Sequence, residues 1–179
     1  VPEQNLLPVP DGMSDEKAAA FTMVYGTSYY ALKQRGNLQP GESLLVLGAS
    51  GGVGLATVEL GKAMGAKVIA AASSAEKALR AMGWNGRHLI IGFAAGEIPK
   101  IPANLTLLKG CSVVGVFWGS FTQREPEASA QNMMELMKLY AEGKIDPKIS
   151  AVYEFEDYAK ALGALTERKA TGKVVLKVG

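Results

Sequence analysis

One glycine-rich stretch constrains the fold of this chain more than any other part of its sequence. Residues 48–54 read Gly-Ala-Ser-Gly-Gly-Val-Gly. The mostly apolar run Ser43–Leu47 before them predicts a buried strand, and residues 55–65 after them carry apolar side chains at helical spacing. Glycines between a strand and a helix let the backbone approach a phosphate, and the N–H groups and dipole of the helix start favour an anion. The stretch therefore predicts a phosphate-binding turn.

A second apolar run, residues 67–72, predicts another buried strand and closes a βαβ unit of about thirty residues. The glycine spacing is G-x-x-G-x-x-G, through Gly48, Gly51 and Gly54, rather than the commoner G-x-G-x-x-G. A glycine-rich turn without a ligand is the alternative interpretation. The order of strand, loop, helix and strand favours a dinucleotide site.

The end of the second predicted strand indicates which dinucleotide binds. NAD sites place Asp or Glu about twenty residues after the glycine turn, where it holds the ribose 2′-hydroxyl. Here the strand tip is small and neutral, with Ser73 and Ser74 followed by Lys77. These residues can hold a 2′-phosphate, which a carboxylate would repel, so NADP(H) is predicted as the cofactor. Capping of the next helix is the other role open to Ser73 and Ser74.

The composition excludes several classes of protein. The chain has 179 residues, of which 48% are hydrophobic, so it can bury a sizeable core. A net charge of +2 does not favour a nucleic-acid or membrane partner, and no apolar run reaches the roughly eighteen residues of a membrane-spanning helix. One cysteine and one histidine predict neither a disulfide nor a zinc site. With no signal-peptide pattern at the start, we expect a cytoplasmic protein.

The pattern of apolar residues predicts an α/β fold with a mostly parallel sheet. A helix is expected from residue 15 to about residue 24, where Gly26 interrupts it, and another from 27 to 34. Tyr29 and Lys33 have the spacing of a short-chain dehydrogenase catalytic pair, but they precede the glycine turn, and packing is the preferred role. Further expected elements are strands at 88–93, 112–117, 151–155 and 173–178, helices at 74–84, 125–140 and 156–169, and a short helix or turn at 104–109. His88 and Cys111 are expected to be structural.

The segments that carry these patterns resemble the zinc-independent quinone oxidoreductases of the medium-chain dehydrogenase/reductase superfamily, the zeta-crystallin-like group. They include residues 18–21, 26–32, 48–54, 66–71, 86–93, 104–118 and 171–176. The resemblance implies a Rossmann-like, three-layer αβα domain that binds NADPH and passes a hydride to a quinone or an activated alkene. It also implies three parts: a linker with interdomain helices (1–40), the nucleotide-binding domain (41–142) and a C-terminal strand-helix-strand (143–179).

The resemblance assigns the cofactor site residue by residue. The pyrophosphate would face the backbone N–H groups of the glycine turn, the 2′-phosphate would meet the strand tip, and the nicotinamide would lie between two later strand ends. No catalytic side chain and no metal ligand is implied. The implied cofactor-binding residues are Thr27, Gly48, Ser50, Gly51, Gly52, Val53, Gly54, Ser73, Ser74, Lys77, Gly92, Phe93, Ala94, Phe117, Trp118 and Gly119.

The sequence departs from the family pattern in two places. The N-terminal catalytic domain is absent, and about fifty residues are missing between Lys77 and Ala78, including a central strand beside the glycine-turn strand. That strand's neighbour would have to be replaced, either by the third strand sliding inward or by a strand of another copy. Exposed strand edges and the Met-rich helix at 125–140 also predict self-association, as a dimer. A catalytically inactive Rossmann-like binding or structural module is therefore the alternative function.

Overall fold

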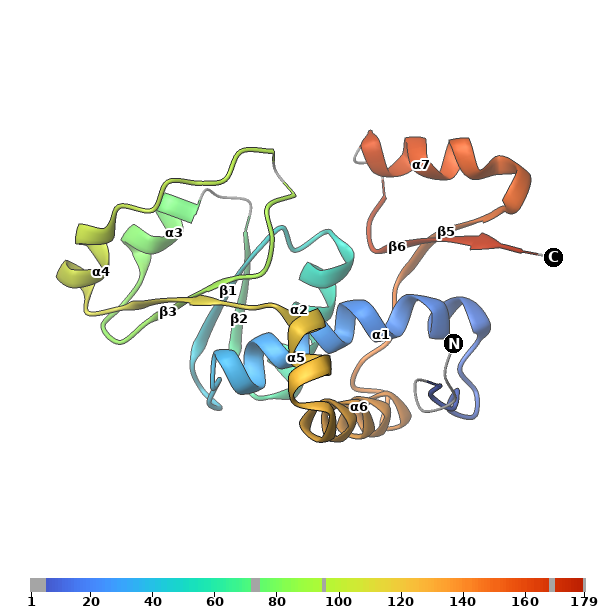
Figure 1. The fold of residues 1–179 in the computed structure, drawn as a ribbon, viewed down its shortest axis with the longest axis horizontal. Helices are drawn as coiled ribbons and strands as arrows, with labels where there is room; N and C mark the ends of the chain where they lie inside the picture. The colour runs from blue at the N-terminus through green and yellow to red at the C-terminus, as the bar shows by residue number, and fades with distance from the viewer. Residues whose placement is uncertain (1–5, 72–74, 95, 168–169, 179) are drawn as a thin grey trace.

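The computed structural model of the chain describes residues 6–71, 75–94, 96–167 and 170–178. Figure 1 shows the C-terminal elements β5, α7 and β6 set apart from the earlier strands, with α1 running between the two groups. In chain order the elements are α1 (Asp15–Tyr30), η2 (Ala31–Arg35), β1 (Ser43–Leu47), α2 (Gly52–Ala63), β2 (Lys67–Ala71), α3 (Ala75–Ala81), β3 (Arg87–Ile90), α4 (Ala103–Lys109), β4 (Ser112–Gly115), α5 (Trp118–Arg124), α6 (Pro126–Ala141), β5 (Ile149–Glu154), η3 (Phe155–Asp157), α7 (Tyr158–Thr166) and β6 (Lys173–Lys177).

The helix α1 is longer than the sequence pattern predicts. It begins as expected at Ser14, whose Oγ accepts a hydrogen bond of 3.4 Å from the backbone N–H of Lys17. The predicted interruption at Gly26 is wrong, because the helix continues through this residue and into the π-helical turn η2. A Cβ at Gly26 would lie 2.8 Å from the indole of Trp118. The glycine therefore permits close packing of α5 on α1 and does not end the helix.

The main core forms where α1 packs against α2 and α6. Met133 and Leu136, on the Met-rich face of α6, are almost completely buried there. This face is covered by α1 of the same chain, so it does not support the predicted self-association. The other buried members of the cluster are Met13, Phe21, Val24, Tyr25, Tyr29, Leu32, Ala56, Leu60 and Ile145.

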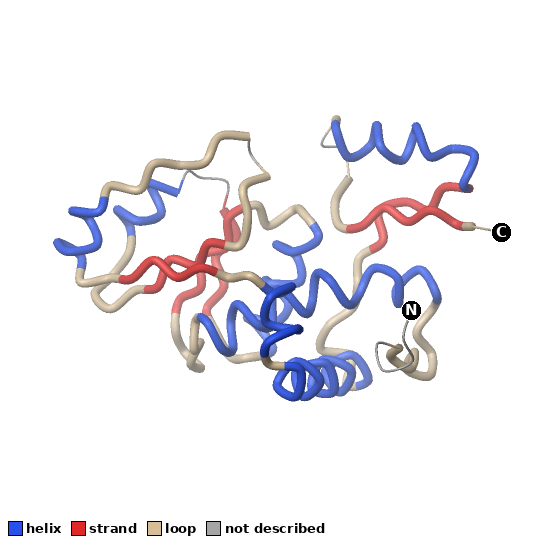
Figure 2. Tube along the Cα trace, in the orientation of Figure 1, coloured by secondary structure: helices blue, strands red, loops and turns tan. Residues whose placement is uncertain are grey.

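Within the described residues, the strands form three separate parallel pairs, and Figure 2 draws the strands in red. β1 pairs with β2, β3 with β4, and β5 with β6. Parallel pairing is confirmed, and the C-terminal strand-helix-strand is present as β5, α7 and β6. Among the described residues β3 is not paired with β1, so the third strand has not slid inward to replace a missing neighbour.

Most predicted elements are present, with boundaries that shift by a few residues. The helix after the glycine turn begins earlier than expected, at Gly52, because the glycines form its first turn. The strand expected to reach Phe93 ends at Ile90, and the one expected to reach Phe117 ends at Gly115. The sequence analysis missed the short helix α5, which begins at Trp118, within a stretch expected to frame a cofactor.

Candidate functional site

The glycine turn is as tight as its sequence suggests. Gly48 adopts a φ of +69°, a backbone conformation that L side chains rarely adopt, and its carbonyl accepts a hydrogen bond of 3.1 Å from the N–H of Gly51. A Cβ added to Gly54 would overlap the carbonyl oxygen of Gly48 and lie 2.8 Å from Cα of Ala49. The first turn of α2 is therefore pressed against the end of β1, and only glycine fits at position 54.

The start of α2 presents backbone donors without a side-chain cap. Gly51 is the N-cap, and it has no side chain to satisfy the first N–H groups of the helix. The N–H groups of Gly52, Val53 and Gly54 come too early in the helix to reach an i−4 helical carbonyl. The uncapped first N–H groups and the positive end of a twelve-residue helix therefore lie where the resemblance puts a pyrophosphate.

A segment from the far end of the chain lies against the same turn. The N–H of Gly172 donates a hydrogen bond of 3.1 Å to the carbonyl of Ser50, and Gly172 forms a parallel bridge with Gly51. A Cβ on Gly52 would lie 2.9 Å from Cδ of Lys173. This packing brings a lysine to the start of α2. Sequence reasoning took Lys173 only as the first residue of a strand, because its partner is more than a hundred residues away.

Buried hydroxyl groups connect α1 to the first turn of α2. The Ser28 hydroxyl, which is completely buried, donates to the carbonyl of Val53 at 3.0 Å. The Thr57 hydroxyl donates to the same carbonyl at 2.8 Å and lies 3.0 Å from Ser28 Oγ. These bonds fix how α2 sits on α1 and hence where its N–H groups point. Sequence reasoning missed Ser28; the only available signal was a small polar residue within an otherwise apolar helix face.

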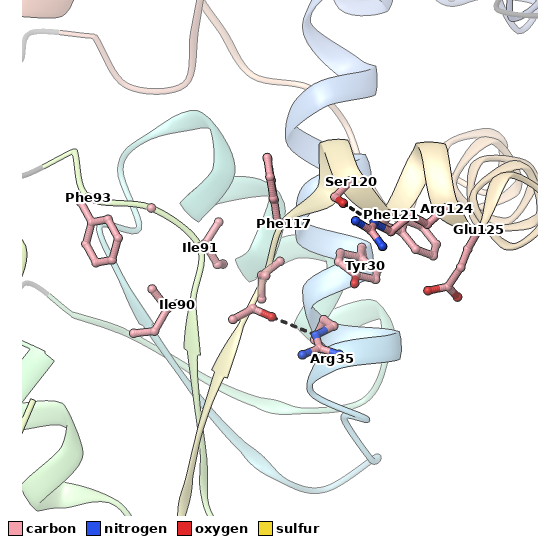
Figure 3. A pocket seen from close by; sticks show the side chains of 13 residues that line it. Tyr30, Arg35, Ile90, Ile91, Phe93, Phe117, Ser120, Phe121, Arg124 and Glu125 are labelled. Atoms are coloured by element: carbon pink, nitrogen blue, oxygen red, sulfur yellow. Dashed lines mark hydrogen bonds between the residues drawn. The ribbon is translucent and has the colours of Figure 1, made fainter. Parts of the chain in front are cut away.

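The residues predicted to surround the nicotinamide fall into two groups. Trp118 packs its indole over Gly26 of α1, the residue before Thr27 in the chain. Gly92, Phe93 and Phe117 instead line a cavity of about 500 Å³ near the ends of β3 and β4 (Figure 3). The other residues lining it are Tyr30, Arg35, Ile90, Ile91, Gly115, Val116, Ser120, Phe121, Arg124 and Glu125.

The cavity is mainly apolar, with charged groups on one side. The Tyr30 ring stacks on Phe121 with centroids 4.1 Å apart, and Arg35 Nε donates to the carbonyl of Gly115 at 2.9 Å. Phe117, by contrast, is 76% exposed. The residues of the glycine turn, all of which the structure describes, do not line this cavity. The predicted pyrophosphate and ring regions therefore do not share this cavity.

The remaining predicted site residues that the structure describes lie outside the glycine turn and do not line the cavity. Ala94 directly follows the cavity-lining Phe93, and Gly119 lies in the first turn of α5. Lys77 lies on α3, where it is exposed. Ser73 and Ser74 fall outside the described residues. The proposed 2′-phosphate site can therefore be followed in the structure only at Lys77.

The Tyr29 and Lys33 pair serves a contact between helices. The Tyr29 hydroxyl and the Lys33 ammonium both donate to Oε2 of Glu135 on α6, each at 2.6 Å. Burial raises the pKa of Glu135, but hydrogen bonds from Lys33, Tyr29 and Gln131 outweigh it and hold the pKa at about 2. Burial and the bond to Glu135 raise the pKa of Tyr29. The Tyr29 hydroxyl is thus hydrogen-bonded to Glu135 in the contact between α1 and α6.

Comparison with known proteins identifies the family. The sequence profile described as "Zinc-binding dehydrogenase" matches residues 36–176. The chain belongs to this dehydrogenase family. The bovine quinone oxidoreductase-like protein 2 is 33% identical over 223 residues, covering 98% of this chain and 64% of the bovine protein. The acryloyl-coenzyme A reductase of Metallosphaera sedula is 30% identical over 213 residues, covering 96% of this chain and 61% of that protein.

A solved structure confirms the fold of this dehydrogenase chain. The quinone oxidoreductase from Thermus thermophilus, described together with its NADPH complex, superposes with a TM-score of 0.87 at 30% identity. The superposition covers 99% of this chain and 71% of that protein. The Rossmann-like α/β class and the resemblance to quinone oxidoreductases are therefore confirmed. The chain spans less than two thirds of the curated relatives it matches.

The side chains of this dehydrogenase chain do not fit the zinc site that the family's name implies. His88 and Cys111 are the only histidine and cysteine of the sequence. Within the described ranges, no group of three or more His, Cys, Asp or Glu side chains is placed to hold a metal ion. Burial lowers the pKa of His88, which favours its neutral form in the β3–β4 pair.

Within the described ranges, no helix has the length and hydropathy needed to cross a bilayer.

Proposed function

We propose that this chain is the NADPH-binding part of an oxidoreductase that transfers a hydride from NADPH to a quinone or an activated alkene. The observation that carries the proposal is the start of α2, where the N-cap Gly51 leaves the first N–H groups without a side-chain cap, behind a turn that admits only glycine at position 54. The Thermus thermophilus relative with an NADPH complex supports the cofactor. The quinone oxidoreductase-like and acryloyl-coenzyme A reductase relatives support the two acceptor classes.

In this proposal, different residues of the chain bind different parts of the cofactor. The N–H groups of Gly52, Val53 and Gly54 bind the diphosphate, and Lys173 adds a positive charge beside them. Ser50, with its carbonyl occupied by Gly172, belongs to the wall of this turn. The proposed contacts to the 2′-phosphate are Ser73, Ser74 and Lys77. NADH has no 2′-phosphate and would not use them.

The proposed nicotinamide region uses the two groups of residues described above. Thr27 and Trp118 approach from α1 and α5, and Gly92, Phe93 and Phe117 come from the cavity at the strand ends. Bound NADPH supplies the hydride itself. The protein orients the ring and keeps water away from it with apolar side chains. Phe117, 76% exposed in this chain, would be covered by a bound ring.

The proposal is tested by fluorescence titration of the chain with NADPH and with NADH. We expect NADPH to bind more tightly, and Lys77→Glu to narrow or reverse the preference. Lys138→Glu is the matched control, since it makes the same charge change at a side chain that is 78% exposed on α6. Equal affinities for the two cofactors in the starting protein would contradict the 2′-phosphate assignment. No saturable binding of either cofactor would contradict the proposed function itself.

A binding module without turnover is the second candidate. It is favoured by the exposed ring region and by the division of the strands into three pairs. Steady-state oxidation of NADPH with a simple quinone separates the two. Turnover supports the enzyme, whereas saturable binding without turnover supports the module.

A further inference from the structure

The hydroxyl of Tyr30 is a polar group of the cavity that the proposed cofactor contacts do not use. Tyr30 is 9% exposed, and its ring stacks on Phe121. Among the residues that the structure describes, this hydroxyl has no hydrogen-bond partner, yet no fully buried side-chain oxygen or nitrogen lacks one. The hydroxyl is therefore not sealed in the core, and it reaches the cavity that Tyr30 lines. Such a group is available to donate a hydrogen bond to a ligand.

Two arginines line the cavity on the same side as Tyr30. In the view of Figure 3, Tyr30 lies between Arg35 and Arg124, and the apolar side chains of Ile90 and Phe93 lie across from them. Tyr30 ends α1, Arg35 ends η2 and Arg124 ends α5, so the ends of three helical elements supply the polar groups. The cavity therefore has one polar side and one apolar side.

Each arginine is fixed through its Nε atom, which leaves its terminal nitrogens available. Arg35 Nε donates to the carbonyl of Gly115 at 2.9 Å, and Arg124 Nε donates to the hydroxyl of Ser120 at 3.0 Å. Neither guanidinium forms an ion pair with a carboxylate in the described part of the chain. A guanidinium held in this way presents a planar pair of N–H donors that matches a carboxylate or a phosphate.

The charges around the cavity also favour an anion. Two guanidinium groups and one carboxylate, that of Glu125, line it, so two positive charges and one negative charge leave a net charge of +1. The anion is not the diphosphate proposed for the glycine turn, because no residue of that turn lines the cavity. Lys77, proposed for the 2′-phosphate, does not line it either. An anion bound here therefore belongs to a molecule other than the cofactor.

We infer that the cavity binds an electron acceptor that carries a carboxylate or phosphate group. Tyr30, Arg35 and Arg124 hold this acidic group, and the apolar part that accepts the hydride lies against the opposite side. The inference rests on the proposed function, which places the nicotinamide at Phe93 and Phe117 on that apolar side. The cavity volume of about 500 Å³ is within the usual range for small-molecule sites.

The test compares three small aromatic probes that differ only in the group attached to the ring. Benzoate and phenyl phosphate carry the two acidic groups, and benzamide is the neutral counterpart of benzoate. Each is titrated into the intact chain by calorimetry. We expect at least one acid to bind about tenfold more tightly than benzamide, because a hydrogen bond to a charged group is the stronger one. The tighter of the two acids identifies the acidic group. Equal binding of all three probes, or no saturable binding of either acid, would overturn the inference.

Two variants assign the binding to the polar side of the cavity. Tyr30→Phe removes only the hydroxyl and keeps the ring that stacks on Phe121. It should weaken binding of the preferred acid about tenfold and leave benzamide unchanged. Arg124→Gln should weaken the acid at least as much, and Arg124→Lys should restore part of the loss, because it keeps the charge without the planar donor pair. Unchanged acid binding in both Tyr30→Phe and Arg124→Gln would overturn the inference.

The matched control is Lys138→Gln, which removes one positive charge from α6 at a side chain that is 78% exposed and does not line the cavity. It should leave binding of the acid unchanged. An equal loss in Lys138→Gln and Arg124→Gln would show a general effect of net charge and overturn the inference.

Repeating the titrations with saturating NADPH separates this inference from the proposed function. We expect the acid to bind as tightly as before or more tightly. Loss of acid binding through competition would assign the anion site to the cofactor and overturn the inference. Failure of both acids to bind a chain that still binds NADPH would overturn this inference alone. Failure of NADPH to bind would contradict the proposed function, and with it the assignment of the acid to an acceptor.

Discussion

Alanine at position 54 is the sharpest test of the glycine turn. A Cβ there would overlap the carbonyl oxygen of Gly48 and lie 2.8 Å from Cα of Ala49. Both neighbours are backbone atoms, so no flexible side chain can move aside and the turn itself must open. Gly163→Ala is the matched control, since Gly163 lies on α7 and its Cβ would have no atom within 4 Å.

Opening the turn should move at least one backbone N–H out of reach of the diphosphate. A hydrogen bond to a charged group contributes about 1.5–3 kcal/mol, so we expect NADPH affinity to fall about tenfold to a hundredfold. Gly163→Ala should bind nearly as well as the starting protein. Fluorescence titration measures both affinities, and thermal unfolding checks that both variants are folded. NADPH affinity of the Gly54→Ala variant equal to that of the starting protein would refute the assignment of the diphosphate to this turn.

Three further substitutions test how the site is supported. Ser28→Ala should lower the free energy of unfolding by about 1 kcal/mol in urea denaturation, because a buried hydrogen bond between α1 and α2 is lost; an unchanged midpoint would contradict this. Burial raises the pKa of Glu135, yet hydrogen bonds led by that from Lys33 hold it at about 2, below the ordinary 4.5. The ionised Glu135 therefore adds to the free energy of unfolding above pH 4.5, and this addition is lost as the pH falls toward 2. In the Glu135→Gln variant the free energy of unfolding should change less across that pH window, by about 1 kcal/mol after allowing for solvent screening. Gly26→Ala should destabilise the chain by about 1–3 kcal/mol, and by less in a Trp118→Ala background, as measured by a double-mutant cycle.

The local part of the site was predictable because its cause is local. A strand, a glycine turn and a helix follow one another within residues 43–65, and each is specified by its own apolar spacing or by the absence of a Cβ. The same holds for the helix start at Ser14 and for parallel pairing. The break expected at Gly26 was wrong for a related reason: glycine weakens a helix locally, but the packing of Trp118 over this position decides its role.

The sequence by itself determined the α/β class and the glycine turn, because each depends on residue type and spacing. Only the tertiary structure decided that Lys173 reaches the start of α2 and that Ser28 holds the first turn of that helix. These features join residues far apart in the chain. Their pairing depends on how helices pack and which strand edges meet, and a one-dimensional pattern does not encode this directly.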